Sequence, residues 1–172
     1  MAKFLWLDLE MSGLNVDSCR ILECAAIVTD ETWTELATHE VIVKQADAVL
    51  EAMDEWCTKT HGESGLTEAV RTGTPEPEAE ANFLAFLEEH FPKDEPIILA
   101  GNSIGQDRKF LDRYWQKVSQ RLHYRMLDVS SFKLIFLNLY KKEFQKKGAH
   151  RALDDIRESI AELRYYLDYI KV

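Results

Sequence analysis

One segment constrains the fold of this chain more than any other: residues 4–10, which read Phe-Leu-Trp-Leu-Asp-Leu-Glu. Four consecutive apolar residues, followed by two acids with a leucine between them, are typical of a strand that is buried on both faces. Because side chains alternate along a strand, Asp8 and Glu10 point to the same face, about 6.6 Å apart along the chain. Two carboxylates on such a face need a positive partner, and a divalent cation would supply one. The alternative is that the strand ends here and both acids reach water.

The length and composition of the chain favour one globular domain. Its 172 residues are enough for a hydrophobic core, and 46% of them are hydrophobic against 30% charged. We therefore expect a single domain over residues 1–172. No apolar run approaches the ~20 residues of a membrane helix, and the first strand begins so early that we expect no signal peptide. Three cysteines without a Cys-x-x-Cys pair predict reduced, intracellular thiols.

The charge is unevenly distributed along the chain. The net charge is −9, which argues against a large surface for non-specific nucleic-acid binding. Residues 1–100 carry 6 basic and 21 acidic side chains, a net of −15, and residues 101–172 carry 15 basic and 9 acidic ones, a net of +6. An acidic half could hold cations while a basic half meets an anion. Uneven surface charge without a function is the other interpretation.

The order of the elements predicts an α/β fold. Short turns at residues 11–15 and 30–32 separate the first three strands, which favours an antiparallel meander. After these strands, helices and short strands alternate along the chain. The expected strands are residues 4–10, 20–29, 33–43, 97–100 and 126–129, and the expected helices are residues 47–61, 64–70, 78–90, 105–120, 131–144 and 152–170.

Asp107 occupies a place where a surface carboxylate is not expected. It lies in the middle of the apolar stripe of helix 105–120, between Ile104 and the pair Phe110 and Leu111. It also follows the loop that leaves a predicted strand, where α/β proteins place their sites. Asp107 could instead only stabilise the N-terminus of its own helix.

The last helix carries two acids in its first turn. Its apolar stripe runs from Leu153 to Ile170, and by the helical step of about 100° Asp155 lies at the rim of this stripe while Asp154 faces solvent. His150 falls in or just before the first turn. Beside a metal-bound carboxylate, such a histidine could take a proton from water; alone, it would be a solvated loop residue.

Together these residues predict a metal-dependent hydrolytic site. Asp8, Glu10, Asp107 and Asp155 come from three separate segments, and four carboxylates suit Mg²⁺ or Mn²⁺ better than zinc. Two such ions ~3.5–4 Å apart would activate a water and stabilise the leaving oxygen of a phosphodiester. His150 would then act as the general base.

Three motifs resemble those of the DEDDh exonuclease superfamily, and most closely those of the oligoribonuclease family. The first is Asp-Leu-Glu-Met-Ser-Gly-Leu at residues 8–14, and the second is Gly-Asn-Ser-Ile-Gly-Gln-Asp at residues 101–107. The third is His-Arg-Ala-Leu-Asp-Asp-Ile-Arg-Glu-Ser-Ile-Ala-Glu-Leu at residues 150–163. A lone Asp-x-Glu is a weak signal, whereas three motifs in this order over a chain of this length are a specific one.

The resemblance implies both a fold and an activity. The fold is ribonuclease H-like, an α/β arrangement with a central mixed five-stranded sheet flanked by helices. The activity is that of a 3′-to-5′ exoribonuclease, which uses two divalent ions, Mg²⁺ or Mn²⁺, and a histidine general base. It hydrolyses very short RNA, dinucleotides above all, to 5′-mononucleotides. A single exonuclease domain, a homodimer, a cytoplasmic location and no membrane association are implied as well.

Further residues match positions near the substrate in that family. Leu14 resembles a wedge between the two bases, and Trp56 resembles an aromatic that stacks on a base, although Trp56 could instead be packed in the core. His61 and Ser103 match residues next to the substrate. A later segment resembles a cap on the 5′-phosphate that the partner subunit helps to form. Its matching residues are Tyr124, Arg125, Ser130 and Lys133.

Other interpretations stay open on the sequence. A DEDDh exonuclease for longer RNA or DNA would share the catalytic residues and differ in the cap. A non-catalytic binding protein of the same fold would be expected to lack one or more of the site residues, and all five are present. Residues 135–148 depart from the usual sequence of the family, so the approach to His150 is not predicted.

Overall fold

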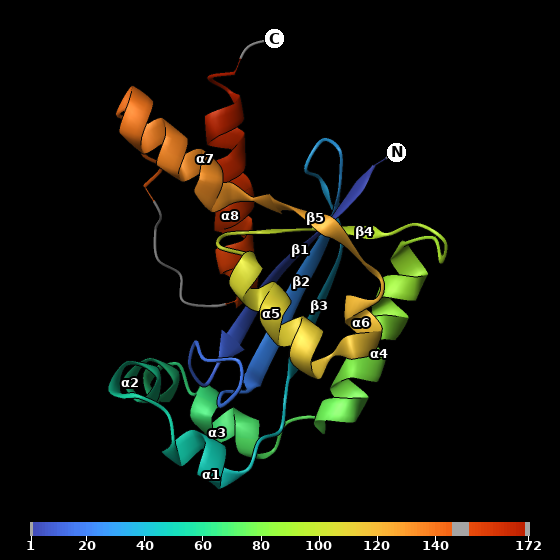
Figure 1. Cartoon of the computed structure of the whole chain (residues 1–172), viewed down its shortest axis with the longest axis vertical. Coiled ribbons are helices and arrows are strands. Elements are labelled where there is room, and N and C mark those ends of the chain that lie inside the picture. The colour runs from blue at the N-terminus through green and yellow to red at the C-terminus, as the bar shows by residue number, and fades with distance from the viewer. Residues whose placement is uncertain (1, 146–151, 171–172) are drawn as a thin grey trace.

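The computed structural model describes residues 2–145 and 152–170, and its framework is a sheet with the strand order β3-β2-β1-β4-β5 (Figure 1). The first three strands form the antiparallel meander that the short turns predict, whereas β4 and β5 run parallel to β1. The mixed five-stranded sheet is therefore confirmed. The strands are β1 (Lys3–Met11), β2 (Ile21–Asp30), β3 (Glu35–Ile42), β4 (Ile97–Gly101) and β5 (Leu122–Asp128).

Strand β1 lies at the centre of the sheet because its sequence can be buried on both faces. Its three leucines belong to the core on one face and Trp6 belongs to the core on the other, and each of these side chains is at most 4% exposed. By the alternation of the strand, Asp8 and Glu10 share the face of Trp6. Both acids lie near the C-terminal end of the strand and are half-buried.

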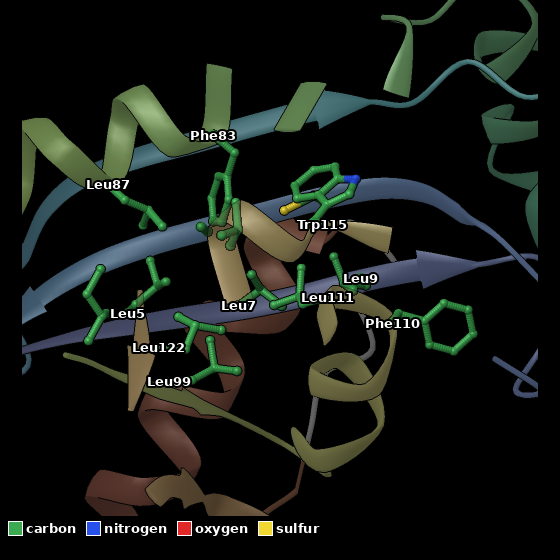
Figure 2. Close-up of a cluster of buried hydrophobic side chains, with 14 of the residues drawn as sticks. Leu5, Leu7, Leu9, Phe83, Leu87, Leu99, Phe110, Leu111, Trp115 and Leu122 are labelled. Atoms are coloured by element: carbon green, nitrogen blue, oxygen red, sulfur yellow. The ribbon is translucent and has the colours of Figure 1, made fainter. Parts of the chain in front are cut away.

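Helices cover both faces of the sheet. On the face of the β1 leucines lie α4 (Glu76–His90) and α5 (Gly105–Tyr114) (Figure 1). On the opposite face, α8 (Ala152–Leu167) packs against β1 and β2. The face that holds Asp8 and Glu10 is therefore the face that α8 covers. Figure 2 shows the large side chains of the main core: Leu5, Leu7, Leu9, Phe83, Leu87, Leu99, Phe110, Leu111, Trp115 and Leu122.

Three short helices lie near the C-terminal end of β1: α1 (Asp47–Glu51), α2 (Glu55–Glu63) and α3 (Leu66–Arg71) (Figure 1). The prediction of one helix over residues 47–61 was wrong, because the helical conformation is interrupted between α1 and α2. The side chain of Asp54 accepts the backbone N–H of Cys57 at 2.7 Å, so it caps a new helix instead of continuing the old one.

Two other predicted helices are also interrupted. The backbone of Trp115 is not helical (φ −119°, ψ 64°), so the predicted helix 105–120 divides into α5 and α6 (Gln116–Ser119) while the indole is buried in the core. The predicted helix 131–144 consists of α7 (Val129–Ile135) followed by a π-helical turn, η1 (Phe136–Tyr140). Among the described residues, none of the helices has the length and apolar character needed to cross a membrane.

Strand β5 begins at Leu122 rather than at residue 126 as predicted. It is an edge strand that pairs with β4 from Ile97 onward, and its middle residues are exposed, so it lacks the apolar signature of a buried strand. The closing helix begins as predicted but ends at Leu167 instead of residue 170.

Candidate active site

Three carboxylates meet where the C-terminal part of β1 faces the first turn of α8. Asp8, Glu10 and Asp155 each offer an oxygen, and these oxygens all lie within 4.8 Å of one another. The alternation of β1 places the two strand acids on one face, and the packing of α8 on that face brings Asp155 to them. The structure thus brings together acids that the sequence analysis singled out on two distant segments.

Asp107 lies beside this cluster, on α5. It is only 5% exposed, and its carboxylate accepts the backbone N–H of Leu9, between the two strand acids, at 2.9 Å. Burial raises the pKa of Asp107 to about 7; the hydrogen bond from Leu9 opposes this shift, and the negative charges of Glu10 and Asp128 add to it. A buried acid with so high a pKa gains most from a nearby cation. Among the described residues, however, the oxygens that lie within 4.8 Å of one another belong to the other three acids, and Asp107 is not part of that group.

The carboxylate cluster borders a cavity of about 770 Å³. Glu10 and Asp155 line it, together with three further carboxylates: Glu23, Glu40 and Glu63. Ala152, the first residue of α8, also lines it, so the chain enters α8 at the cavity. His150, the predicted general base, lies outside the described residues. A cavity with so many acids favours cations, which agrees with the donor chemistry of the cluster.

Helix α2 places an aromatic side chain on the wall of this cavity. Trp56 is 68% exposed, so the alternative of core packing is wrong for this residue. Its ring lies edge-on to His61, with 6.5 Å between the ring centroids. His61 itself is 2% exposed; its Nε2 donates to the carbonyl oxygen of Met11 at 3.0 Å, and its Nδ1 lies 4.0 Å from a carboxylate oxygen of Glu10. His61 therefore connects α2 to the end of β1.

The loop after β1 presents Leu14 to solvent with 75% of the residue exposed. Two contacts from α5 hold this loop. The side-chain amide of Gln106 donates to the carbonyl oxygen of Leu14 at 2.6 Å, and the hydroxyl of Tyr114 donates to the carbonyl oxygen of Val16 at 2.6 Å. An exposed apolar side chain on a fixed backbone is suited to insertion between two flat groups. The sequence analysis did not identify Gln106 or Tyr114 in this supporting role.

Ser103 and Ser130 are in contact with each other, at the ends of β4 and β5. The backbone N–H of Ser103 donates to Oδ1 of Asp128 at 3.0 Å and to Oγ of Ser130 at 2.8 Å. The two hydroxyl oxygens are 3.0 Å apart. Ser103 has a φ of +50°, a conformation that is uncommon for residues other than glycine, and these hydrogen bonds hold it there.

The remaining residues of the predicted cap lie along the edge of the sheet. Tyr124 is 73% exposed on β5, and the guanidinium of Arg125 lies 5.2 Å from its ring centroid. Lys133 on α7 forms an ion pair with Glu143, with 3.8 Å between Nζ and the carboxylate oxygen. The cap residues are thus exposed or half-buried on β5, the strand farthest from β3, and on α7, which follows it.

One buried carboxylate was not identified from the sequence. Glu162 of α8 is 0% exposed and binds Asn102, which follows β4 directly. The helical step of about 100° places Glu162 away from the apolar stripe and close to Asp155 on the helix surface, so the periodicity of the sequence did not indicate its burial.

The solved structures that resemble this chain confirm the fold. The chain superposes on the zinc-bound form of Escherichia coli exonuclease I in complex with single-stranded DNA with a TM-score of 0.72 at 16% sequence identity. The exonuclease I of Methylocaldum szegediense gives a TM-score of 0.73 at 17% identity. In both cases the match covers 99% of this chain and 43% of the other, so the chain spans less than half the length of either exonuclease I. The α/β sheet is therefore a ribonuclease H-like fold, as expected.

Sequence comparison shows the family. A family model described as an exonuclease matches residues 5–163. The oligoribonuclease of Francisella tularensis subsp. novicida (strain U112) is 50% identical over 167 residues, which cover 94% of this chain and 92% of the relative. The oligoribonuclease of Marinobacter nauticus is 48% identical over 97% of this chain and 95% of the relative. Because the match is close and extends over almost the whole of both sequences, this chain belongs to the oligoribonuclease family and is an enzyme of the exonuclease class.

Proposed function

We propose that this enzyme is a 3′-to-5′ exoribonuclease that hydrolyses very short RNA, dinucleotides above all, to 5′-mononucleotides. The observation that carries the proposal is the meeting of Asp8, Glu10 and Asp155, with oxygens within 4.8 Å of one another, at a cavity that Trp56 also lines. Carboxylates at this separation can share cations and hold a phosphodiester through them. An exposed aromatic on the same cavity can hold a base.

The donor set fits two divalent ions, Mg²⁺ or Mn²⁺. All its candidate ligands are carboxylate oxygens, which hard cations prefer, and Asp107 adds a buried carboxyl directly behind the strand acids. When bound, two such ions supply the positive charge that activates a water and offsets the charge developing on the scissile phosphate. Asp8, Glu10, Asp107 and Asp155 would hold the ions, and His150 would accept a proton from the attacking water.

Three groups of residues would confine the enzyme to short substrates. Trp56 stacks on one base, a contact worth about 1–3 kcal/mol that does not depend on base identity. Leu14 separates the two bases, and His61 steadies α2 beneath Trp56 through its bond to Met11. The cap binds the 5′-phosphate and closes the cleft behind the second nucleotide, and its residues are Tyr124, Arg125, Ser130 and Lys133. Ser103, which contacts Ser130, lies next to the substrate.

A homodimer would complete this cap, and an exposed apolar surface supports the pairing. Strand β5 is an edge strand, and apolar side chains are exposed on it and on the helices that follow. They are Tyr124, Met126, Leu134, Ile135, Leu137, Leu139, Tyr140, Tyr169 and Ile170. A second copy of the chain, placed on this surface around a two-fold axis, would cover these residues in both subunits.

The resemblance to the oligoribonuclease family also implies a location, and we place the single-domain enzyme in the cytoplasm.

The proposal is tested by incubating the purified protein with a 5′-labelled RNA dinucleotide, with Mn²⁺ and with chelator. We expect metal-dependent release of a labelled mononucleotide by the wild type. The Asp8→Asn variant, which keeps the size of the side chain, should bind the dinucleotide and fail to cleave it. An intact dinucleotide in the presence of wild type and Mn²⁺ would overturn the proposal.

A further inference from the structure

A buried polar network connects the end of β4 to α8. The side-chain amide nitrogen of Asn102 donates to Oγ of Ser159 at 2.8 Å and to Oε2 of Glu162 at 3.1 Å. The hydroxyl of Tyr166 donates to the other carboxylate oxygen of Glu162 at 3.1 Å. Ser159, Glu162 and Tyr166 are each at most 6% exposed. Burial raises the pKa of Tyr166 to about 12, so its hydroxyl remains a donor to Glu162.

The network determines which way the amide of Asn102 points. Both acceptors on α8 take hydrogens from its nitrogen, because the hydroxyl of Ser159 gives its own hydrogen to the backbone carbonyl of Asp155 at 2.9 Å. The amide oxygen of Asn102 must then face the other way. There it accepts the hydroxyl hydrogen of Ser130 at 3.2 Å. The buried carboxylate of Glu162 thus orients a side chain that contacts Ser130 on the far side.

This orientation of Asn102 affects Ser130, a residue of the predicted cap, and through it Ser103, which is predicted to lie next to the substrate. With its hydrogen directed at Asn102, the hydroxyl of Ser130 has its lone pairs free to accept the backbone N–H of Ser103 at 2.8 Å. That bond helps to hold Ser103 at its uncommon φ of +50°. One side chain, Asn102, therefore links the Ser103–Ser130 pair to the turn of α8 that carries Asp155.

We propose that Asn102, held by Glu162 and Ser159, is a positioning residue that fixes Ser103 and Ser130 in the arrangement that receives the 5′-phosphate of a dinucleotide. This rests on the proposed function, because it assumes that these serines contact the phosphate. Asn102 itself acts through Ser130. Its effect should therefore appear in the binding of a substrate that carries a 5′-phosphate, and not in the binding of one that lacks it.

The test compares KM for an RNA dinucleotide with and without a 5′-phosphate in the wild type and three variants. Asn102→Ala removes the link, and Ser159→Ala weakens it by a smaller change that keeps the helix. Tyr166→Phe is the matched control, because it removes one hydrogen bond to the same Glu162 and leaves the contacts of Asn102 in place. Melting temperatures establish that each variant is folded.

For the wild type we expect a lower KM when the 5′-phosphate is present. Asn102→Ala should raise KM for the phosphorylated dinucleotide by roughly three- to tenfold, the effect of about one hydrogen bond, and leave KM for the other dinucleotide unchanged. Ser159→Ala should change the same KM in the same direction by less, and Tyr166→Phe should change neither.

Two results would overturn the inference. If the wild type cleaves and prefers the phosphorylated dinucleotide, but Asn102→Ala and Ser159→Ala lose affinity equally for both substrates, then Asn102 has only a structural role. The same conclusion follows if Tyr166→Phe shows the phosphate-specific loss as strongly as Asn102→Ala. If instead the wild type cleaves neither dinucleotide, the proposed function fails first, and the inference fails with it.

Discussion

At the scale of single residues, the site depends on clustered acids whose negative charges a divalent cation would offset. Asp8, Glu10 and Asp155 bring negative charges close together, and Asp107 is buried with a pKa raised to about 7. Carboxylates this close repel one another, and a divalent ion that binds only the folded cluster stabilises the folded chain. We therefore expect Mn²⁺ to raise the melting temperature of the wild type.

Asp107 gives a prediction about stability and pH for the metal-free protein. Its pKa is about 7 in the folded chain against a reference value of 3.8, so its stabilising contribution is present below 3.8 and is lost as the pH rises through 7. Asp107→Asn, which keeps an oxygen to accept the N–H of Leu9, should therefore raise the melting temperature more at pH 8 than at pH 5. Thermal unfolding in chelator tests this, and an equal effect at both pH values would contradict it.

Trp56 gives a prediction about substrate binding. Its side chain is largely exposed, so Trp56→Ala should leave the melting temperature nearly unchanged. Loss of the stacking contact should raise KM for a dinucleotide by roughly 5- to 150-fold, since such a contact is worth about 1–3 kcal/mol. Trp56→Phe keeps an aromatic face and should retain most of the affinity. If Trp56→Ala binds like the wild type, the ring does not contact the substrate.

At the scale of elements, the faces of β1 and α8 that carry the acids followed from their sequences. The period of two in β1 put Asp8 and Glu10 on one face, and the helical period put Asp155 at the rim of the buried side of α8. Asp107 could also be identified, because it interrupted an apolar stripe. The breaks in the helices could not be predicted from periodicity. Asp54 begins a new helix through a local capping hydrogen bond, and Trp115 leaves helical geometry where its indole packs in the core; the apolar pattern shows neither break.

Contacts between distant elements were equally beyond the sequence. Nothing in the pattern around Asn102 indicates that it meets Glu162, sixty residues later in the chain. Gln106 was visible only as part of a motif, and its contact with the carbonyl of Leu14 depends on how the loop after β1 folds back on α5. Such supporting residues become evident only when the packing of the sheet is known.

The capping of α2 gives a prediction at this scale. The hydrogen bond from the backbone of Cys57 lowers the pKa of Asp54, so the ionised carboxylate stabilises the start of the helix that carries Trp56. Asp54→Ala should lower the melting temperature and raise KM for a dinucleotide, whereas Asp54→Ser, which keeps a capping oxygen, should change both less. An unchanged KM together with a lower melting temperature would separate the cap from the position of Trp56.

At the scale of the whole molecule, the exposed apolar surface on β5, α7, η1 and the end of α8 predicts self-association. Leu139 is 72% exposed on this surface, and Leu139→Asp should shift the protein from dimer to monomer. Leu36 on β3, 49% exposed at the opposite edge of the sheet, provides the control, because Leu36→Asp should leave the dimer intact. Sedimentation of both variants tests this. A monomeric wild type, or a dimer in Leu139→Asp, would contradict the assignment of this surface.

The dependence of kcat/KM on substrate length tests whether the site acts on very short RNA. We would measure cleavage of 5′-labelled RNA of two, five and twenty nucleotides by the wild type in Mn²⁺, with chelator as the control. We expect fast, metal-dependent loss of the dinucleotide and much slower loss of the twenty-nucleotide strand, because the proposed cap would close the cleft behind the second nucleotide. Equal rates on all three lengths would contradict it and leave an exonuclease without a length limit.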